Sequence, residues 1–100
     1  MRIGTTPTHT FELPSNLGAI DKVRIAYAQG RDVVLTKEFE GSAVINDSIS
    51  FKLSQEETFL FKSKMDVFIQ VRVLLVDGTA LASDIITTTA EKCLDSEVLQ

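Results

Sequence analysis

The sequence predicts a single all-β domain, and three observations support that fold class. Of its 100 residues, 27 are Val, Ile or Thr, the β-branched types that fit a pleated, half-buried surface. Apolar and polar residues alternate with a period of two over much of the chain, as in strands with one buried face. Turn-forming residues separate these runs about every 8–12 residues, which is typical of a β-sandwich or a small barrel.

The first part of the chain predicts an N-terminal arm over residues 1–7, followed by three strands. Alternation predicts these strands over residues 8–13, 20–28 and 33–39. The breaks between and after them contain Pro or Gly, and they are Pro14–Gly18, Gln29–Asp32 and Glu40–Ser42. The second break is a tight hairpin signal, because Gly30 lies inside it.

The middle of the chain predicts two strands and one helical turn. Residues 43–45 predict a short strand that ends in the turn cluster Asn46–Ser48, and residues 49–53 alternate regularly. Ser54-Gln55-Glu56-Glu57 matches a capping box, in which the serine and the second glutamate satisfy free backbone amides at the start of a helix. We therefore expect one helical turn near residues 55–61, with Phe59, Leu60 or Phe61 filling the end of the core.

The last part of the chain predicts a long hairpin and a tail. Residues 66–76 form the longest expected strand, and Asp77-Gly78 predicts a type I′ turn into a returning strand over residues 79–89. Alternation fails at Ile85-Ile86, which indicates either a bulge or a stretch covered on both faces. Residues 90–100 predict a docked tail or a marginal helix.

These elements favour one antiparallel β-sandwich of about seven strands over residues 1–100. Size and strand number match an immunoglobulin-like domain, although the chain has one Cys and no Trp and so lacks the disulfide and buried Trp of antibody domains. The strand over residues 66–76 is apolar on both faces, with Phe68, Leu74 and Leu75 set against Val67 to Val73. A small sandwich covers one face of each sheet, so we expect the tail or another subunit to cover the excess.

Charge and hydropathy exclude several partner classes. The net charge is −4 and no two basic residues are adjacent, whereas nucleic acids and anionic membrane surfaces require a basic patch. No apolar run approaches the roughly 20 residues of a membrane-spanning helix, and no apolar segment follows the first residues as in a signal peptide. We therefore expect no nucleic-acid or membrane partner, and a chain that stays in the compartment where it is made.

The reactive residue types predict no catalytic, cofactor or metal site. His9 is the single histidine and shares a strand face with Phe11, so a surface or rim histidine is expected rather than a triad member. The adjacent pair Glu56-Glu57 is explained by helix capping. Cys93 stands alone, which excludes an intrachain disulfide and favours an unreactive thiol.

Turn aspartates, glycines and aromatics also have structural explanations. Loop aspartates can bind calcium, but no calcium-loop spacing is present, so turn formation is the expected role of Asp32, Asp47, Asp77 and Asp84. The five glycines are isolated at turns, which excludes a phosphate-binding loop. The seven aromatics occupy mostly strand positions, so we expect core residues rather than a base-stacking platform.

Several segments resemble one family. The stretches are Ile3–Phe11, Ile25–Gln29, Leu53–Thr58, Ile69–Leu74 and Ala82–Ile85. Together they resemble small uncharacterised β-sandwich proteins encoded in phages and prophages of Gram-positive bacteria. The resemblance implies synthesis in the bacterial cytoplasm, a structural or accessory role in a tail, baseplate or head, and incorporation in a virion; it carries over no catalytic residues.

The function expected from these observations is non-enzymatic. A structural or protein-interaction module would act through sheet edges and outer faces, with a second copy of itself or another phage structural protein as partner. The alternative is a carbohydrate- or ligand-binding sandwich for surface adhesion. Sugar binding usually employs exposed Trp or Tyr, and Tyr27 is the one candidate.

Overall fold

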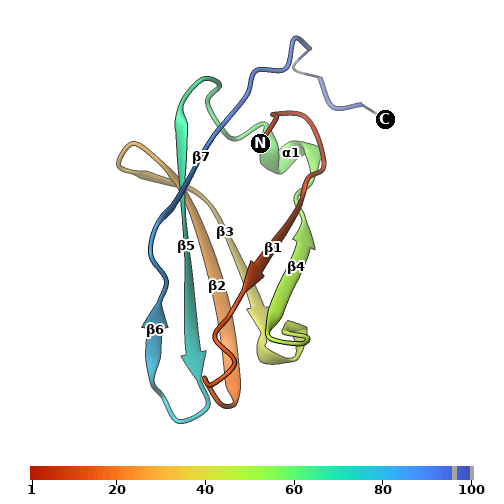
Figure 1. Cartoon of the computed structure of the whole chain (residues 1–100). Helices are drawn as coiled ribbons and strands as arrows, with labels where there is room; N and C mark the ends of the chain where they lie inside the picture. Colours follow the sequence, from red (N-terminus) through yellow and green to blue (C-terminus); the bar gives the residue numbers. More distant parts are fainter. Residues whose placement is uncertain (96, 100) are drawn as a thin grey trace.

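The computed structural model describes residues 1–95 and 97–99 and confirms an all-β, sandwich-like fold of two antiparallel sheets (Figure 1). The strands are β1 (Thr8–Glu12), β2 (Ile20–Gln29), β3 (Asp32–Glu40), β4 (Ser48–Lys52), β5 (Asp66–Leu75), β6 (Ala80–Ala82) and β7 (Ile86–Thr89). One 3₁₀ turn, η1 (Gly41–Ala43), and one helical turn, α1 (Gln55–Thr58), complete the described elements. None of the helical segments described is long and apolar enough to cross a membrane.

The larger sheet contains five strands in the order β3-β2-β5-β6, with β7 paired to β5 along the same edge as β6. β2 and β5 are its long central strands, and their alternation directs one side chain in two toward the interior. Val23, Ile25 and Tyr27 of β2 are fully buried, while Arg24 between them is exposed. The period-two pattern of the sequence therefore identifies the inner face correctly.

The smaller sheet pairs β1 with β4 and lies over part of the larger sheet (Figure 1). His9 pairs with Phe51 and Phe11 with Ile49, which places all four side chains on the face toward β2 and β5. The two sheets meet through aromatic contacts, including Phe39 with Phe51 at a centroid distance of 4.9 Å.

The core combines the inner faces of both sheets with residues from the chain ends and the helical turn. The buried hydrophobic residues are Ile3, Val23, Ile25, Tyr27, Ile49, Leu53, Phe61, Val67, Ile69, Val71, Val73 and Ala90. Burial of this surface provides most of the driving force for folding.

The predicted capping box is present at α1. The Ser54 hydroxyl accepts a hydrogen bond from the Glu57 amide, and the Glu57 carboxylate accepts one from the Ser54 amide. Of the three candidates for filling the core, Phe61 is buried and packs edge-on against Tyr27, whereas Leu60 is 56% exposed.

The type I′ turn predicted at Asp77-Gly78 is wrong. Only Gly78 of this pair has a positive φ. Residues 76–78 form a three-residue loop, in which the Gly78 amide donates to the Leu75 carbonyl and the Leu75 amide donates to the Thr79 carbonyl. The loop has the features of a type I turn followed by a left-handed glycine. Asn46 and Asp47 both have positive φ between Ile45 and Ser48, which is the pattern of a type I′ turn.

The short strand predicted over residues 43–45 is also wrong, because the 3₁₀ turn occupies residues 41–43. Gly41 explains this difference: a Cβ at this position would overlap the carbonyl oxygen of Ile20. The chain therefore presses against the start of β2 and turns there, and only Ile45 makes an isolated bridge, with Ser48.

The strand predicted over residues 79–89 is divided into β6 and β7 by a bulge, one of the two explanations that the broken alternation allowed. Three residues, 83–85, face two residues of β5. The Ser83 hydroxyl accepts a hydrogen bond from the Val71 amide at 3.0 Å, a role that a backbone carbonyl has in a regular ladder.

Both chain ends dock on the domain. Ile3 of the expected arm is a core residue, and its amide donates to the Glu91 carbonyl, so the start and end of the chain pair beside each other. The tail runs past α1 and does not cover the outer face of β5 (Figure 1), which corrects that expectation. Leu94 is 96% exposed, and the Leu99 backbone bonds to the side chain of Gln55, the first residue of α1. Pairing at Glu91 directs the tail across the end of the sandwich, and no helix forms in its described residues.

Candidate functional site

An apolar groove runs between the two sheets on the side where β1 faces β6 and β7. Its volume is about 430 Å³, and its walls come from β1, the loop that follows β1, and the inner face of the larger sheet's edge. The lining residues are Thr10, Phe11, Glu12, Leu13, Pro14, Leu17, Val71, Val73, Leu81, Ala82, Ser83 and Ile86. The groove exists because the two-stranded sheet is too narrow to cover the five-stranded sheet.

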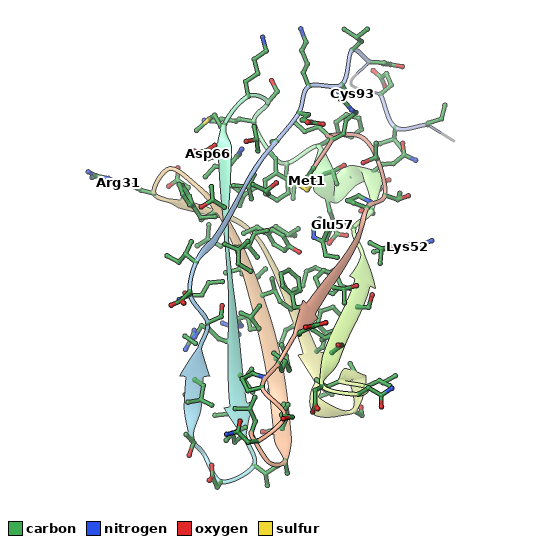
Figure 2. The ribbon with its side chains drawn as sticks, viewed as in Figure 1. Met1, Arg31, Lys52, Glu57, Asp66 and Cys93 are labelled. Carbon is green, nitrogen blue, oxygen red and sulfur yellow. The ribbon has the colours of Figure 1, made fainter. Side chains whose placement is uncertain are left out.

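The rim of this groove exposes apolar side chains to solvent. Leu81 is 39% exposed and Ile86 is 46% exposed, and the neighbouring Ile85 is 61% exposed. Exposed apolar side chains beside a concave site are typical of a protein or ligand contact. Side chains visible in Figure 2 enter the space between β1 and the larger sheet from both sides.

A free sheet edge borders the same groove, because β1 pairs with β4 and with no other described strand. The Leu13 amide donates to the Asp47 carbonyl, and the Leu53 amide donates to the Pro7 carbonyl. In an antiparallel ladder these bonds recur at every second residue. Residues 9 and 11 therefore bond to β4, whereas Thr8, Thr10 and Glu12 direct their N–H and C=O groups away from it.

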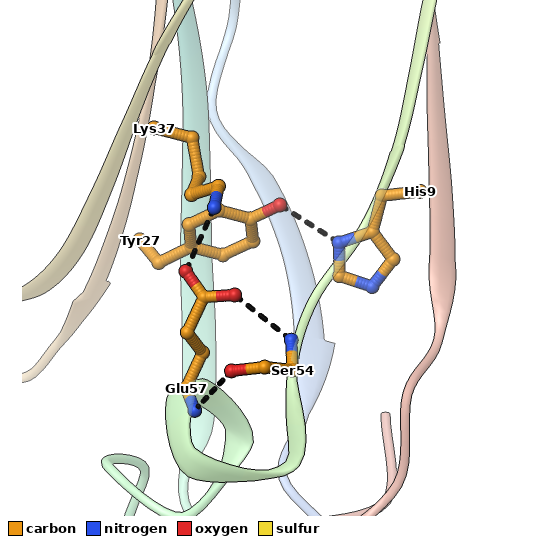
Figure 3. Close-up of polar contacts among 5 residues, drawn as sticks. All are labelled: His9, Tyr27, Lys37, Ser54 and Glu57. Carbon is orange, nitrogen blue, oxygen red and sulfur yellow. Dashed lines mark hydrogen bonds and ion pairs between the residues drawn. The ribbon is translucent and has the colours of Figure 1, made fainter.

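The second notable cluster is polar and buried under the small sheet (Figure 3). The Tyr27 hydroxyl lies 2.7 Å from Nδ1 of His9, and Tyr27 is fully buried. Burial, together with the nearby charge of Glu57, raises the pKa of Tyr27 well above its usual value. Burial also lowers the pKa of His9, and the positive N-terminus lowers it further.

An ion pair continues this cluster toward the surface. Nζ of Lys37 lies 2.8 Å from Oε2 of Glu57, and both side chains are mostly buried. Burial alone would raise the pKa of Glu57, but hydrogen bonds from Lys37 and from Ser54 hold it below its usual value. The cluster therefore connects β3, α1 and the strands beneath them, and among the described residues no buried side-chain nitrogen or oxygen atom lacks a hydrogen-bond partner.

A third cluster lies on the outer face of the larger sheet. Arg24 and Arg72 are directly opposite each other on β2 and β5, and Arg24 forms two hydrogen bonds to Oε2 of Glu38. Lys22 also approaches Glu38, at 3.9 Å. These side chains line a shallow, solvent-exposed depression with a volume of about 230 Å³.

The residues considered for chemistry in the sequence are dispersed. His9 lies half-buried on the inner face and contacts Tyr27. Asp32 and Asp77 lie at opposite ends of the larger sheet, since β2 and β5 are antiparallel. Within residues 1–95 and 97–99, no three His, Cys, Asp or Glu side chains gather as a metal site. The Cys93 thiol is half-buried beside Gly4.

Sequence reasoning did not find the groove or the free edge of β1. Alternation placed Phe11 and Leu13 on a common face, which is correct. It contained no signal for which strand pairs with β1, so the unpaired edge became visible only in three dimensions.

The fold and these surfaces define a class, a small all-β sandwich-like domain with an open edge beside an apolar groove. Comparisons with protein-family models, with curated proteins and with solved structures found no match.

Proposed function

We propose that this chain is a non-enzymatic protein-interaction module that binds an extended segment of a partner along the free edge of β1. The single observation behind this proposal is the coincidence of unpaired backbone groups at Thr8, Thr10 and Glu12 with the apolar groove. Strand addition uses both features, because backbone hydrogen bonds supply affinity and alternate side chains enter the groove.

The phage setting of this proposal comes from the sequence resemblance. A structural or accessory role in a tail, baseplate or head requires stable contacts between proteins, which strand addition supplies. The position of the gene tests this setting: flanking capsid, portal or tail genes are expected, and a neighbourhood of metabolic genes would contradict it. The immunoglobulin-like relationship stays a prediction, because strand number alone does not define that family.

The binding mode can be tested with linear peptides selected from a random library on the immobilised protein. Selected peptides are expected to alternate apolar and polar residues, and calorimetry measures their affinity for wild type and two variants. Thr10→Pro removes the outward amide and the hydroxyl contact with Ser50 but no backbone bond to β4, so we expect about tenfold weaker binding or more. Thr10→Val loses the same hydroxyl but keeps the amide, and it should bind like wild type.

Binding of a small ligand is the second candidate, and the groove volume of about 430 Å³ supports it. Small-molecule sites are commonly apolar clefts of roughly 300–1,000 Å³. A ligand held only by the side chains of the groove does not need the Thr10 amide. Peptides or ligands that bind Thr10→Pro as tightly as wild type would therefore contradict strand addition and favour this candidate.

A further inference from the structure

The sheet edges of this domain differ in how well they can accept another strand. Edge strands in monomeric proteins are usually blocked by charge, bulges or covering segments. β3 has charged ends: an antiparallel pair of two β3 strands over their full length would place Asp32 opposite Glu40. β6 and β7 are short and interrupted by the bulge at residues 83–85.

The outer edge of β4 is partly occupied. The Ser48 amide donates to the Ile45 carbonyl, and the Ile45 amide donates to the Ser48 carbonyl, at 3.0 and 2.8 Å. Of the described strands, β1 is thus the one whose edge has neither a covering segment, nor a bulge, nor a charge before its final residue.

The edge of β1 is also complementary to itself. In an antiparallel pair of two β1 strands centred on Thr10, Thr10 faces Thr10 of the second copy, and Thr8 faces Glu12. Each of these pairs exchanges both N–H···O bonds, because all three residues direct their backbone groups outward. The single charged residue, Glu12, faces a neutral threonine, so no like charges meet.

We infer that the segment bound along β1 is β1 of a second copy of this chain, related by a twofold axis at Thr10. The inference rests on the proposed function, since it assigns the occupant of the same edge. The two-stranded sheets join into one four-stranded sheet, which is more stable because a sheet of only two strands is marginally stable on its own. The open side of each sandwich then faces its counterpart, and the exposed Leu81 and Ile86 lie at this boundary. A twofold axis closes the assembly at a dimer.

Sedimentation of the full chain tests the inference directly. Wild type and Thr10→Val are expected to sediment as dimers at about 0.5 mM, well above a micromolar Kd. Thr10→Pro is expected to sediment as a monomer, because it lacks the central amide. If Thr10→Pro does not show the circular dichroism and melting of the folded wild type, Thr10→Lys provides the same test by adding an edge charge.

Cysteine cross-linking tests the register. In a Cys93→Ser background, Thr10→Cys is expected to form an intermolecular disulfide on oxidation, because opposed residues lie about 5.5 Å apart. Glu12→Cys alone should not cross-link, but it should cross-link when mixed with Thr8→Cys. This matched pair separates specific pairing from random collision of thiols.

The outcomes distinguish this inference from the proposed function. A wild-type monomer at about 0.5 mM, or a dimer that Thr10→Pro and Thr10→Lys leave intact, overturns the inference of a β1–β1 dimer. If selected peptides still require the Thr10 amide in that case, strand addition stands with a different occupant. If neither peptides nor a second copy depend on Thr10, both proposals fail.

Discussion

The buried Tyr27 hydroxyl and Nδ1 of His9 lie 2.7 Å apart, which joins the central strand of the larger sheet to β1 of the smaller one. Aromatic contacts surround this hydrogen bond. His9 packs edge-on against Phe11 and Phe51, and Tyr27 packs edge-on against Phe61. Stability should therefore depend on the protonation state of His9.

Acidification is expected to destabilise the fold through His9. Its pKa is lowered from 6.5 by burial and by the N-terminus, so the unfolded chain binds more protons than the folded chain below about pH 6.5. The free energy of unfolding should fall as pH decreases from 7 to 5, measured by urea denaturation. His9→Gln should flatten this dependence, since the chain has no other histidine; an unchanged slope would contradict the assignment.

Below about pH 4.5 a different group contributes. The pKa of Glu57 is held below its usual 4.5, so the stability contributed by its bonds to Lys37 and Ser54 is present above that pH and is lost below it. Glu57→Gln should reduce the loss of stability between about pH 4.5 and pH 3. Glu56→Gln is the matched control, because Glu56 is exposed and lies outside the capping bonds.

Gly41→Ala is expected to destabilise the protein by about 1–3 kcal/mol. The added Cβ would overlap the backbone carbonyl of Ile20, which cannot move without disturbing the start of β2. Thermal denaturation measures the effect. Ser42→Ala, at the exposed next position, should leave the melting temperature nearly unchanged; equal effects at both positions would contradict the close approach.

Ser83→Ala is expected to cost about 1 kcal/mol of stability. The Val71 amide loses its acceptor, because the Ser83 hydroxyl fills that role in the bulge. Hydrogen exchange should show faster exchange of the Val71 amide in this variant. Ser83→Thr retains the hydroxyl and should preserve the protection; faster exchange in both variants would show that the bulge itself is intolerant of substitution.

Ser54→Ala should weaken the capping box by about 1 kcal/mol. The Glu57 amide loses its side-chain acceptor at the start of α1, and Phe61 is displaced more easily from the core. Chemical denaturation measures the loss, with Ser63→Ala as an exposed serine outside the helix. A loss of similar size at Ser63 would contradict the role of the cap.

The sequence by itself determined the elements whose signals are local. Alternation identified the inner faces of β2 and β5, because a strand places neighbouring side chains on opposite faces whatever its partner. The capping box was readable at Ser54, since its two bonds lie within one turn. The lost alternation at residues 85–86 indicated an irregularity there, but it allowed a stretch covered on both faces as well as the bulge that forms.

Only the tertiary structure decided the features that depend on distant backbone. The turn at residues 41–43 is set by the carbonyl of Ile20, and the path of the tail is set by pairing between Glu91 and the first three residues. Strand alternation contains no information on which strands are neighbours, so the order of the sheets and the free edge of β1 were invisible in the sequence. The groove follows from a two-stranded sheet facing a five-stranded one, a mismatch in width that exists only after the strands have paired.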